Sequence, residues 1–271
     1  MKPLVLTLRQ PPDQRLDLSP LVPQRLAGRS AAVIAAIALQ TGREKVTVGD
    51  AFRLRMGDVE QIRIDGGSDR LDGIGEGMTA GEITVEGDAG ARAGRLMAGG
   101  RLTIGGHAGP FAASGMKGGE LVISGSAGDR LGGPLAGETA GMRGGVVIVH
   151  GDAGEQAGDR LRRGTIVIEG RAGRAAGSRM IAGTLIVRRA AGPCPGILMG
   201  RGTIVLGEPA VDLSPGFVDC GQHQLVALRL MAAFVRSHSR RAAALLERPL
   251  RRLAGDMAVL GRGEILIAET G

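Results

Sequence analysis

The chain has 271 residues, with 34 Lys and Arg against 27 Asp and Glu, and a formal net charge of +7. This length suits one large domain or two small ones, and the absence of an apolar run of about 18 residues or a signal-peptide stretch favours a cytoplasmic protein without a membrane partner. Tyr and Trp are absent and only two cysteines occur, so neither a base-stacking surface for nucleic acid nor a disulfide framework is expected.

The first 57 residues follow no repeat and are predicted to cap one end of the fold. Strands are predicted over residues 5–8, 45–48 and 52–56, and a helix is predicted over residues 31–39, with Ser30 as its N-cap and Gly42 as its end. Residues 61–66 are a weak copy of the repeated strand described next. A terminal unit of different sequence is expected, because an open stack of strands would pair with other chains.

A repeat of 19 residues occupies the predicted second domain, residues 58–212. Each unit has a glycine two residues before a short aliphatic strand, and the steps between these glycines are 19, 19, 26, 19, 19 and 19 residues: Gly81, Gly100, Gly119, Gly145, Gly164, Gly183 and Gly202. An alanine stands eight residues after each glycine. The residue three positions before it is always Met or Leu: Met78, Met97, Met116, Met142, Leu161, Met180 and Met199.

This period predicts a mainly β chain folded as a right-handed parallel β-helix of about 19 residues per turn. The aliphatic pair, the alanines and the methionines should form separate columns in its interior. Two further glycine columns mark corners, with Ala113 as the one substitution. A left-handed hexapeptide coil would instead show an aliphatic residue every six positions. The glycines also lack the strand–loop–helix context of a phosphate-binding loop.

The single step of 26 residues adds seven residues within the segment 129–144, which is either an interaction loop or a tolerated bulge. After Ala210 the repeat stops, and residues 213–271 are predicted as a helical or capping extension. Helices are predicted over residues 222–240, 242–246 and 250–253, and a strand over residues 263–267. The first helix could lie over the end or side of the coil, or bind a partner.

The histidines, serines and acids form no catalytic set. His107 and His150 lie two turns apart without a third ligand at repeat spacing, so exposed or capping roles are favoured over a metal site. Ser114 and Ser124 have no neighbouring His and Asp in the sequence. Acids at turn positions are interpreted as a solvated face: Glu82, Glu86, Asp88, Asp152 and Glu169. We therefore predict no catalytic residue and no metal on this chain.

Arginines are concentrated toward the end of the repeat, with nine between Asp159 and Arg201 against two acids. Residues of equal phase stack on neighbouring turns, and like charges so close together repel one another unless an anion binds them. The candidate binding residues for an anionic ligand or partner are Arg143, Arg160, Arg162, Arg163 and Arg179. A solvated basic surface without a ligand is the alternative interpretation.

The string Gly, Met, Gly, strand, Gly-x-Ala-Gly resembles the glycine-repeat domain of two families. One is the C-terminal scaffold region of glutamate synthase. The other is the C subunit of formylmethanofuran dehydrogenase and of its bacterial counterpart, the formyltransferase/hydrolase complex. The chain length and the segment Gln14-Arg15-Leu16-Asp17-Leu18-Ser19-Pro20-Leu21 favour the bacterial form of the second family.

This resemblance implies a structural subunit of a complex that transfers a formyl group from tetrahydromethanopterin to a methanofuran-type carrier and releases formate. It implies a formyltransferase subunit and a hydrolase subunit as partners, with the metal on another subunit. The carrier is expected to have a polyglutamate tail, which the arginines could hold. The alternatives are a glutamate synthase-type scaffold and an autonomous β-helix enzyme acting on an acidic substrate.

Overall fold

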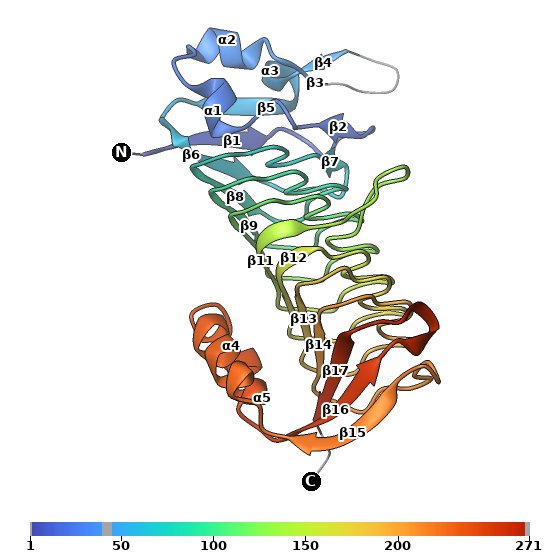
Figure 1. Ribbon diagram of the computed structural model, residues 1–271. Coiled ribbons are helices and arrows are strands. Elements are labelled where there is room, and N and C mark those ends of the chain that lie inside the picture. The colour runs from blue at the N-terminus through green and yellow to red at the C-terminus, as the bar shows by residue number, and fades with distance from the viewer. Residues whose placement is uncertain (1, 40–44, 269–271) are drawn as a thin grey trace.

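The computed structural model of the chain describes residues 2–39 and 45–268, and one sheet of 13 strands runs through its length (Figure 1). In spatial order the strands are β15 (Val218–His223), β16 (Leu250–Gly255), β17 (Gly263–Ala268), β14 (Thr203–Leu206), β13 (Thr184–Val187), β12 (Arg163–Ile168), β11 (Arg143–Val149), β10 (Glu120–Ile123), β9 (Arg101–Ile104), β8 (Glu82–Glu86), β6 (Asp58–Asp65), β1 (Pro3–Leu8) and β5 (Phe52–Arg55). The pairs from β17 through to β1 are parallel, and the antiparallel pairs of this sheet lie at its two ends.

Each repeat unit contributes one strand, and the strands β8 to β14 pair in parallel and in register. Ile83 lies opposite Leu102 and Val85 opposite Ile104, and the same alignment continues to Ile204 in β14. The constant phase of the alanines gives a second ladder of isolated parallel bridges, from Ala89 to Ala191. The predicted stacking of strand on strand is therefore confirmed.

The methionine column is fully buried, because the side chains of its six methionines and of Leu161 have no exposed surface. The glycines serve two different purposes. Gly119 has a φ of +84°, and all seven glycines of its column lie in this left-handed region. Gly109 instead allows a close approach, since a Cβ there would lie 2.7 Å from the carbonyl carbon of Gly90. Ala113 adopts the left-handed φ of the glycines that it replaces, +57°.

The N-terminal segment extends the sheet past β6 and covers its edge. β1 pairs in parallel with β6, and β5 pairs antiparallel with β1. Ser30 caps α2 as predicted, but this helix ends at Ala35, because residues 38–39 pair with residues 46–47. Gly42 lies outside the described residues. The remaining elements here are β2 (Leu16–Asp17), α1 (Pro23–Leu26), α2 (Ala31–Ala35), β3 (Ala38–Leu39), β4 (Val46–Thr47), α3 (Val48–Ala51) and β7 (Leu71–Asp72).

The C-terminal segment returns to the sheet after forming a helical hairpin. Its helices are α4 (Val226–Arg236) and α5 (Arg240–Leu246), and the 3-10 turn η1 (Met257–Val259) follows later in the chain. The helix predicted over residues 250–253 is wrong, because β16 pairs there with both β15 and β17. The predicted strand near residue 263 is confirmed as β17, which adds to β14 in parallel.

The helical hairpin packs on the outer face of the C-terminal half of the sheet (Figure 1). The middle strand residue that faces outward is Thr84 in β8 and Thr103 in β9, both half-buried. In the later strands the same position is apolar and buried against residues of α4 and α5: Ile148, Val167, Ile186, Val205 and Leu266. Of the two positions predicted for it, the hairpin therefore takes the one at the side of the stacked strands and not at their end.

Candidate anion-binding edge and its surroundings

Four exposed cations form a basic edge along one corner of the repeat: Lys117, Arg143, Arg162 and Arg163. The first three each follow directly a buried residue of the methionine column, so the repeat itself places them at the same corner. The backbone N–H of Arg143 donates to the Met116 carbonyl, and that of Arg162 donates to the Met142 carbonyl. These cations therefore lie on successive turns, where an extended anion can contact several of them.

The strand ladder places Arg143 opposite Arg163. Repeat spacing alone predicts Arg162 as the stacking partner of Arg143. The difference arises because the register shifts between Arg143 and Val146, after the longer repeat unit. All three arginines nevertheless remain on the basic edge.

The other two candidate arginines are bound to groups of the chain itself. Arg160 Nη1 donates a hydrogen bond of 3.0 Å to the carbonyl oxygen of Glu138. Arg179 makes a bidentate contact with Asp159, with Nε at 2.9 Å and Nη2 at 2.6 Å from the carboxylate oxygens. Asp159 is fully buried and also accepts a hydrogen bond from Ser178. The charge of Arg179 is therefore compensated, which its position in the repeat does not indicate.

The insertion of residues 129–144 is held against an earlier repeat unit through Glu138. One carboxylate oxygen of Glu138 lies 2.7 Å from Arg95, and the other accepts the Leu135 N–H. Burial alone would raise the pKa of the Glu138 carboxyl, but these partners outweigh it and the pKa is lowered. Beside the insertion, Lys117 and Arg143 line a depression of about 310 Å³ together with Glu138. The insertion thus borders the basic edge.

Two turn acids and one histidine accept hydrogen bonds from backbone N–H groups of the next repeat unit. Asp88 accepts the His107 N–H at 2.7 Å, His107 Nδ1 accepts the Ser126 N–H at 3.0 Å, and Asp152 accepts the Arg171 N–H at 2.6 Å. The capping interpretation is confirmed for His107. Glu82 and Glu86 are exposed, as predicted for a solvated face.

Glu169 departs from the solvated-face prediction, because it is only 8% exposed beneath the helical hairpin. Its carboxylate accepts a hydrogen bond of 2.7 Å from Ser239, the N-cap of α5, and lies 3.3 Å from His150 and 3.7 Å from Arg241. Burial raises the pKa of Glu169, but Ser239, His150 and Arg241 together lower it further than burial raises it. His238 makes a second link between hairpin and sheet, with Nδ1 at 3.0 Å from Glu120.

Glu169→Gln is expected to weaken the docking of α4 and α5 by about 1–3 kcal/mol, because the charged acceptor of the Ser239 hydrogen bond and the ion pair with Arg241 are lost. Acid is expected to weaken the docking in the same way, because the pKa of Glu169 is lowered in the folded chain. Its stabilisation of the hairpin is complete above about pH 4.3, where the carboxyl of an unfolded chain titrates, and is lost as pH falls through the lower folded pKa. Hydrogen exchange of the α4 amides measures both the effect of the substitution and the effect of acid. Unchanged α4 protection in the variant would contradict this role.

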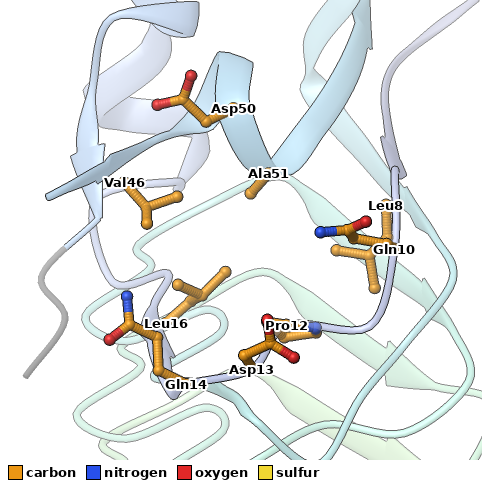
Figure 2. Close-up of a pocket in the computed structure, with 9 residues that line it drawn as sticks. All are labelled: Leu8, Gln10, Pro12, Asp13, Gln14, Leu16, Val46, Asp50 and Ala51. Atoms are coloured by element: carbon orange, nitrogen blue, oxygen red, sulfur yellow. The ribbon is translucent and has the colours of Figure 1, made fainter. Parts of the chain in front are cut away.

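A separate pocket of about 470 Å³ lies in the N-terminal segment between β1, β2 and α3 (Figure 2). Its polar side chains are Gln10, Asp13, Gln14 and Asp50, and none of its described lining residues is a cation. Asp50 already accepts hydrogen bonds from Thr47 in a capping box, which is the main cause of its lowered pKa. This pocket is therefore electrostatically unsuited to an anion.

Within residues 2–39 and 45–268, no group of three His, Cys, Asp or Glu residues is placed to hold a metal ion. Over the same residues, none of the helices combines the length and apolar character needed to cross a bilayer.

The chain is similar to the C subunits of formylmethanofuran dehydrogenases over about a third of its length. No protein-family model matches it. The C subunit of the tungsten-containing formylmethanofuran dehydrogenase 2 of Methanothermobacter thermautotrophicus is 36% identical over 99 residues, which are 35% of this chain and 37% of that protein. The corresponding protein of Methanococcus maripaludis is 32% identical over 92 residues, or 33% and 34% of the two chains.

Similarity to a bacterial protein extends over nearly the whole chain. The C subunit of the formyltransferase/hydrolase complex Fhc of Methylorubrum extorquens is 50% identical over 262 residues, covering 97% of this chain and 98% of that protein. The chain therefore belongs to the family of C subunits of the formyltransferase/hydrolase complex. A chain in the crystal structure of the FhcABCD complex from Methylorubrum extorquens with methylofuran superimposes with a TM-score of 0.95 at 41% identity, covering 98% of this chain and 100% of that one.

Proposed function

We propose that this chain is a structural, non-catalytic subunit that holds a formyltransferase subunit against a hydrolase subunit in one complex. The complex would move a formyl group from tetrahydromethanopterin to a methanofuran-type carrier and release formate, with the metal on another subunit. The observation that carries this proposal is the similarity along the full chain to a subunit of the FhcABCD complex, whose crystal structure contains methylofuran.

We further infer a right-handed parallel β-helix over residues 58–212, capped by residues 1–57 and extended by residues 213–271. The in-register ladders of strands and alanines support this interpretation. A rod of stacked turns suits a cytoplasmic scaffold, because partners can bind at separate positions along it.

Co-purification tests the proposed function directly. An affinity-tagged chain expressed with the other subunits of its complex should retain the formyltransferase and the hydrolase, while the tagged chain alone should show neither activity. Retention of a glutamate synthase instead would support the other scaffold family. Formyl transfer or hydrolysis by the chain alone would contradict a non-catalytic role.

We also propose that the basic edge binds the polyglutamate tail of the carrier. Arg143, Arg162 and Arg163 are exposed on neighbouring turns, and Lys117 extends the edge beside the insertion. Guanidinium groups suit carboxylates because they can form paired hydrogen bonds. Arg160 and Arg179 contribute less in this proposal, since the chain itself provides acceptors for both.

The triple substitution R143Q/R162Q/R163Q is expected to weaken binding of a fluorescent oligoglutamate to the purified complex about tenfold or more, since three ion contacts are lost. Anisotropy titrations at two salt concentrations should also show a smaller salt dependence for the variant. R171Q/R174Q/R189Q removes three exposed arginines that lie between β12 and β13 or just after β13, outside the basic edge, and is the matched control. Equal affinity losses in both variants would contradict a specific role for the basic edge.

A further inference from the structure

An apolar patch is exposed where the last repeat unit meets the turn η1. Ile181, Leu198 and Val259 are 40%, 44% and 43% exposed and line one shallow depression. Met257 and Leu260 belong to the η1 turn beside it and are 54% and 81% exposed. Five large apolar side chains from three separate segments thus lie together at the surface, which is the usual character of a protein-binding site.

The backbone holds two of these leucines in a conformation that leucine rarely adopts. Leu198 has a φ of +58° and Leu260 has a φ of +51°. Glycine or asparagine would occupy such positions with less strain and without exposing an apolar side chain. Leu260 gains little burial within the chain, since it is 81% exposed, so the folded monomer alone offers no physical reason for leucine at position 260.

A buried carboxylate fixes the patch in place. Asp256 is 1% exposed, and its oxygens accept the N–H of Leu198 at 3.1 Å and the N–H of Ala258 at 3.1 Å. The N–H of Arg262 also donates a hydrogen bond of 2.7 Å to the Gly200 carbonyl, which ties the η1 turn to the last repeat unit. The two leucine turns are therefore preorganised relative to each other, which lowers the entropic cost of binding.

The border of the patch is basic. Arg201 lines the same depression, Arg262 follows the η1 turn, and both are exposed. None of the described residues that line the depression is acidic. An apolar surface with this border is complementary to an apolar pocket edged by carboxylates.

We propose that Ile181, Leu198, Met257, Val259 and Leu260 form a docking surface for another protein subunit that presents an apolar pocket bordered by carboxylates. The proposal rests on the proposed function, which gives the chain subunits to hold. Leu260 is the main anchor in this proposal, because it is the most exposed of the five and is fixed by a short turn.

The test uses an affinity-tagged chain co-expressed with the other subunits of its complex. Leu260→Asn should lower the retention of one subunit more than about tenfold, because a buried anchor becomes polar. Asn tolerates the left-handed φ, so the yield of soluble tagged chain and the retention of subunits bound elsewhere should be unchanged. Leu230→Gln is the control, since Leu230 is 72% exposed on the outer side of α4, away from the patch.

The possible outcomes separate the two proposals. If the unsubstituted chain retains no other subunit, the proposed function fails. If it retains them and Leu260→Asn retains them equally well, only the docking surface is overturned. Loss of a subunit in Leu230→Gln but not in Leu260→Asn would place docking on α4 instead. A self-association of the tagged chain that Leu260→Asn abolishes would make a second copy the occupant and would also overturn the proposal.

Discussion

Gly119→Ala is expected to lower the free energy of unfolding by more than about 3 kcal/mol, because two penalties combine. The φ of +84° is strained for any residue with a Cβ, which costs about 1–2 kcal/mol. In addition, the new Cβ would lie 2.6 Å from the carbonyl oxygen of Gly100 and 2.8 Å from the carbonyl carbon of Gly99. These are backbone atoms of the adjacent turn, so relief of the overlap requires the stack itself to move.

Gly77→Ala is the matched control for this prediction. Gly77 has a similar φ of +68°, but no heavy atom lies within 4 Å of the position of its added Cβ. We expect it to lose only the conformational penalty, about 1–2 kcal/mol. Urea denaturation followed by circular dichroism measures both variants. Equal losses would show that close stacking of neighbouring turns is not what requires glycine at position 119.

The sequence predicted the repeated part of the fold well because every unit has the same residue types at the same positions. A glycine column with one alanine, Ala113, was enough to locate a left-handed corner, and the methionine column located the core. The ends have no such repetition. Residues 250–253 contain leucines that suit either a helix or a strand, and their pairing with β15 and β17 decided the outcome.

The side on which the helical hairpin docks was also encoded, but not in the repeat itself. The outward strand position changes from Thr84 and Thr103 to Ile148 and Val167, and this change marks the face that the hairpin covers. A residue type that changes along the chain, as at this outward position, is not visible as a repeat. The burial of Glu169 follows from the same docking, because only the hairpin brings Ser239 and Arg241 to it.

Within the candidate site, repeat phase predicted which arginines share a corner but not which of them are available. Arg162 directly follows Leu161 and Arg179 directly precedes Met180, so both arginines adjoin the buried methionine column in the sequence. Asp159 distinguishes them, since it lies one repeat before Ser178 and turns inward to meet Arg179. A buried acid 20 residues before an arginine is a three-dimensional signal, and it becomes visible only when neighbouring turns are stacked.

Arg179→Gln is therefore expected to destabilise the chain rather than merely reduce its charge. Asp159 is fully buried, and the substitution would leave its carboxylate with Ser178 as its remaining side-chain hydrogen-bond partner. Breaking a buried ion pair from one side costs about 3–5 kcal/mol, and the partial exposure of Arg179 places the expected loss near the lower end. Arg162→Gln, at an exposed position of the basic edge, should change the free energy of unfolding by less than about 0.5 kcal/mol.

The double substitution D159N/R179Q separates a structural role of Arg179 from a binding role. Without the buried charge, most of the lost stability should return, so a double-mutant cycle in urea denaturation should give a coupling of about 2 kcal/mol or more. Oligoglutamate affinity measured on the same double variant should equal that of the unsubstituted complex, because the cations that carry the proposed site are still present. A large affinity loss despite restored stability would return Arg179 to the ligand-binding set.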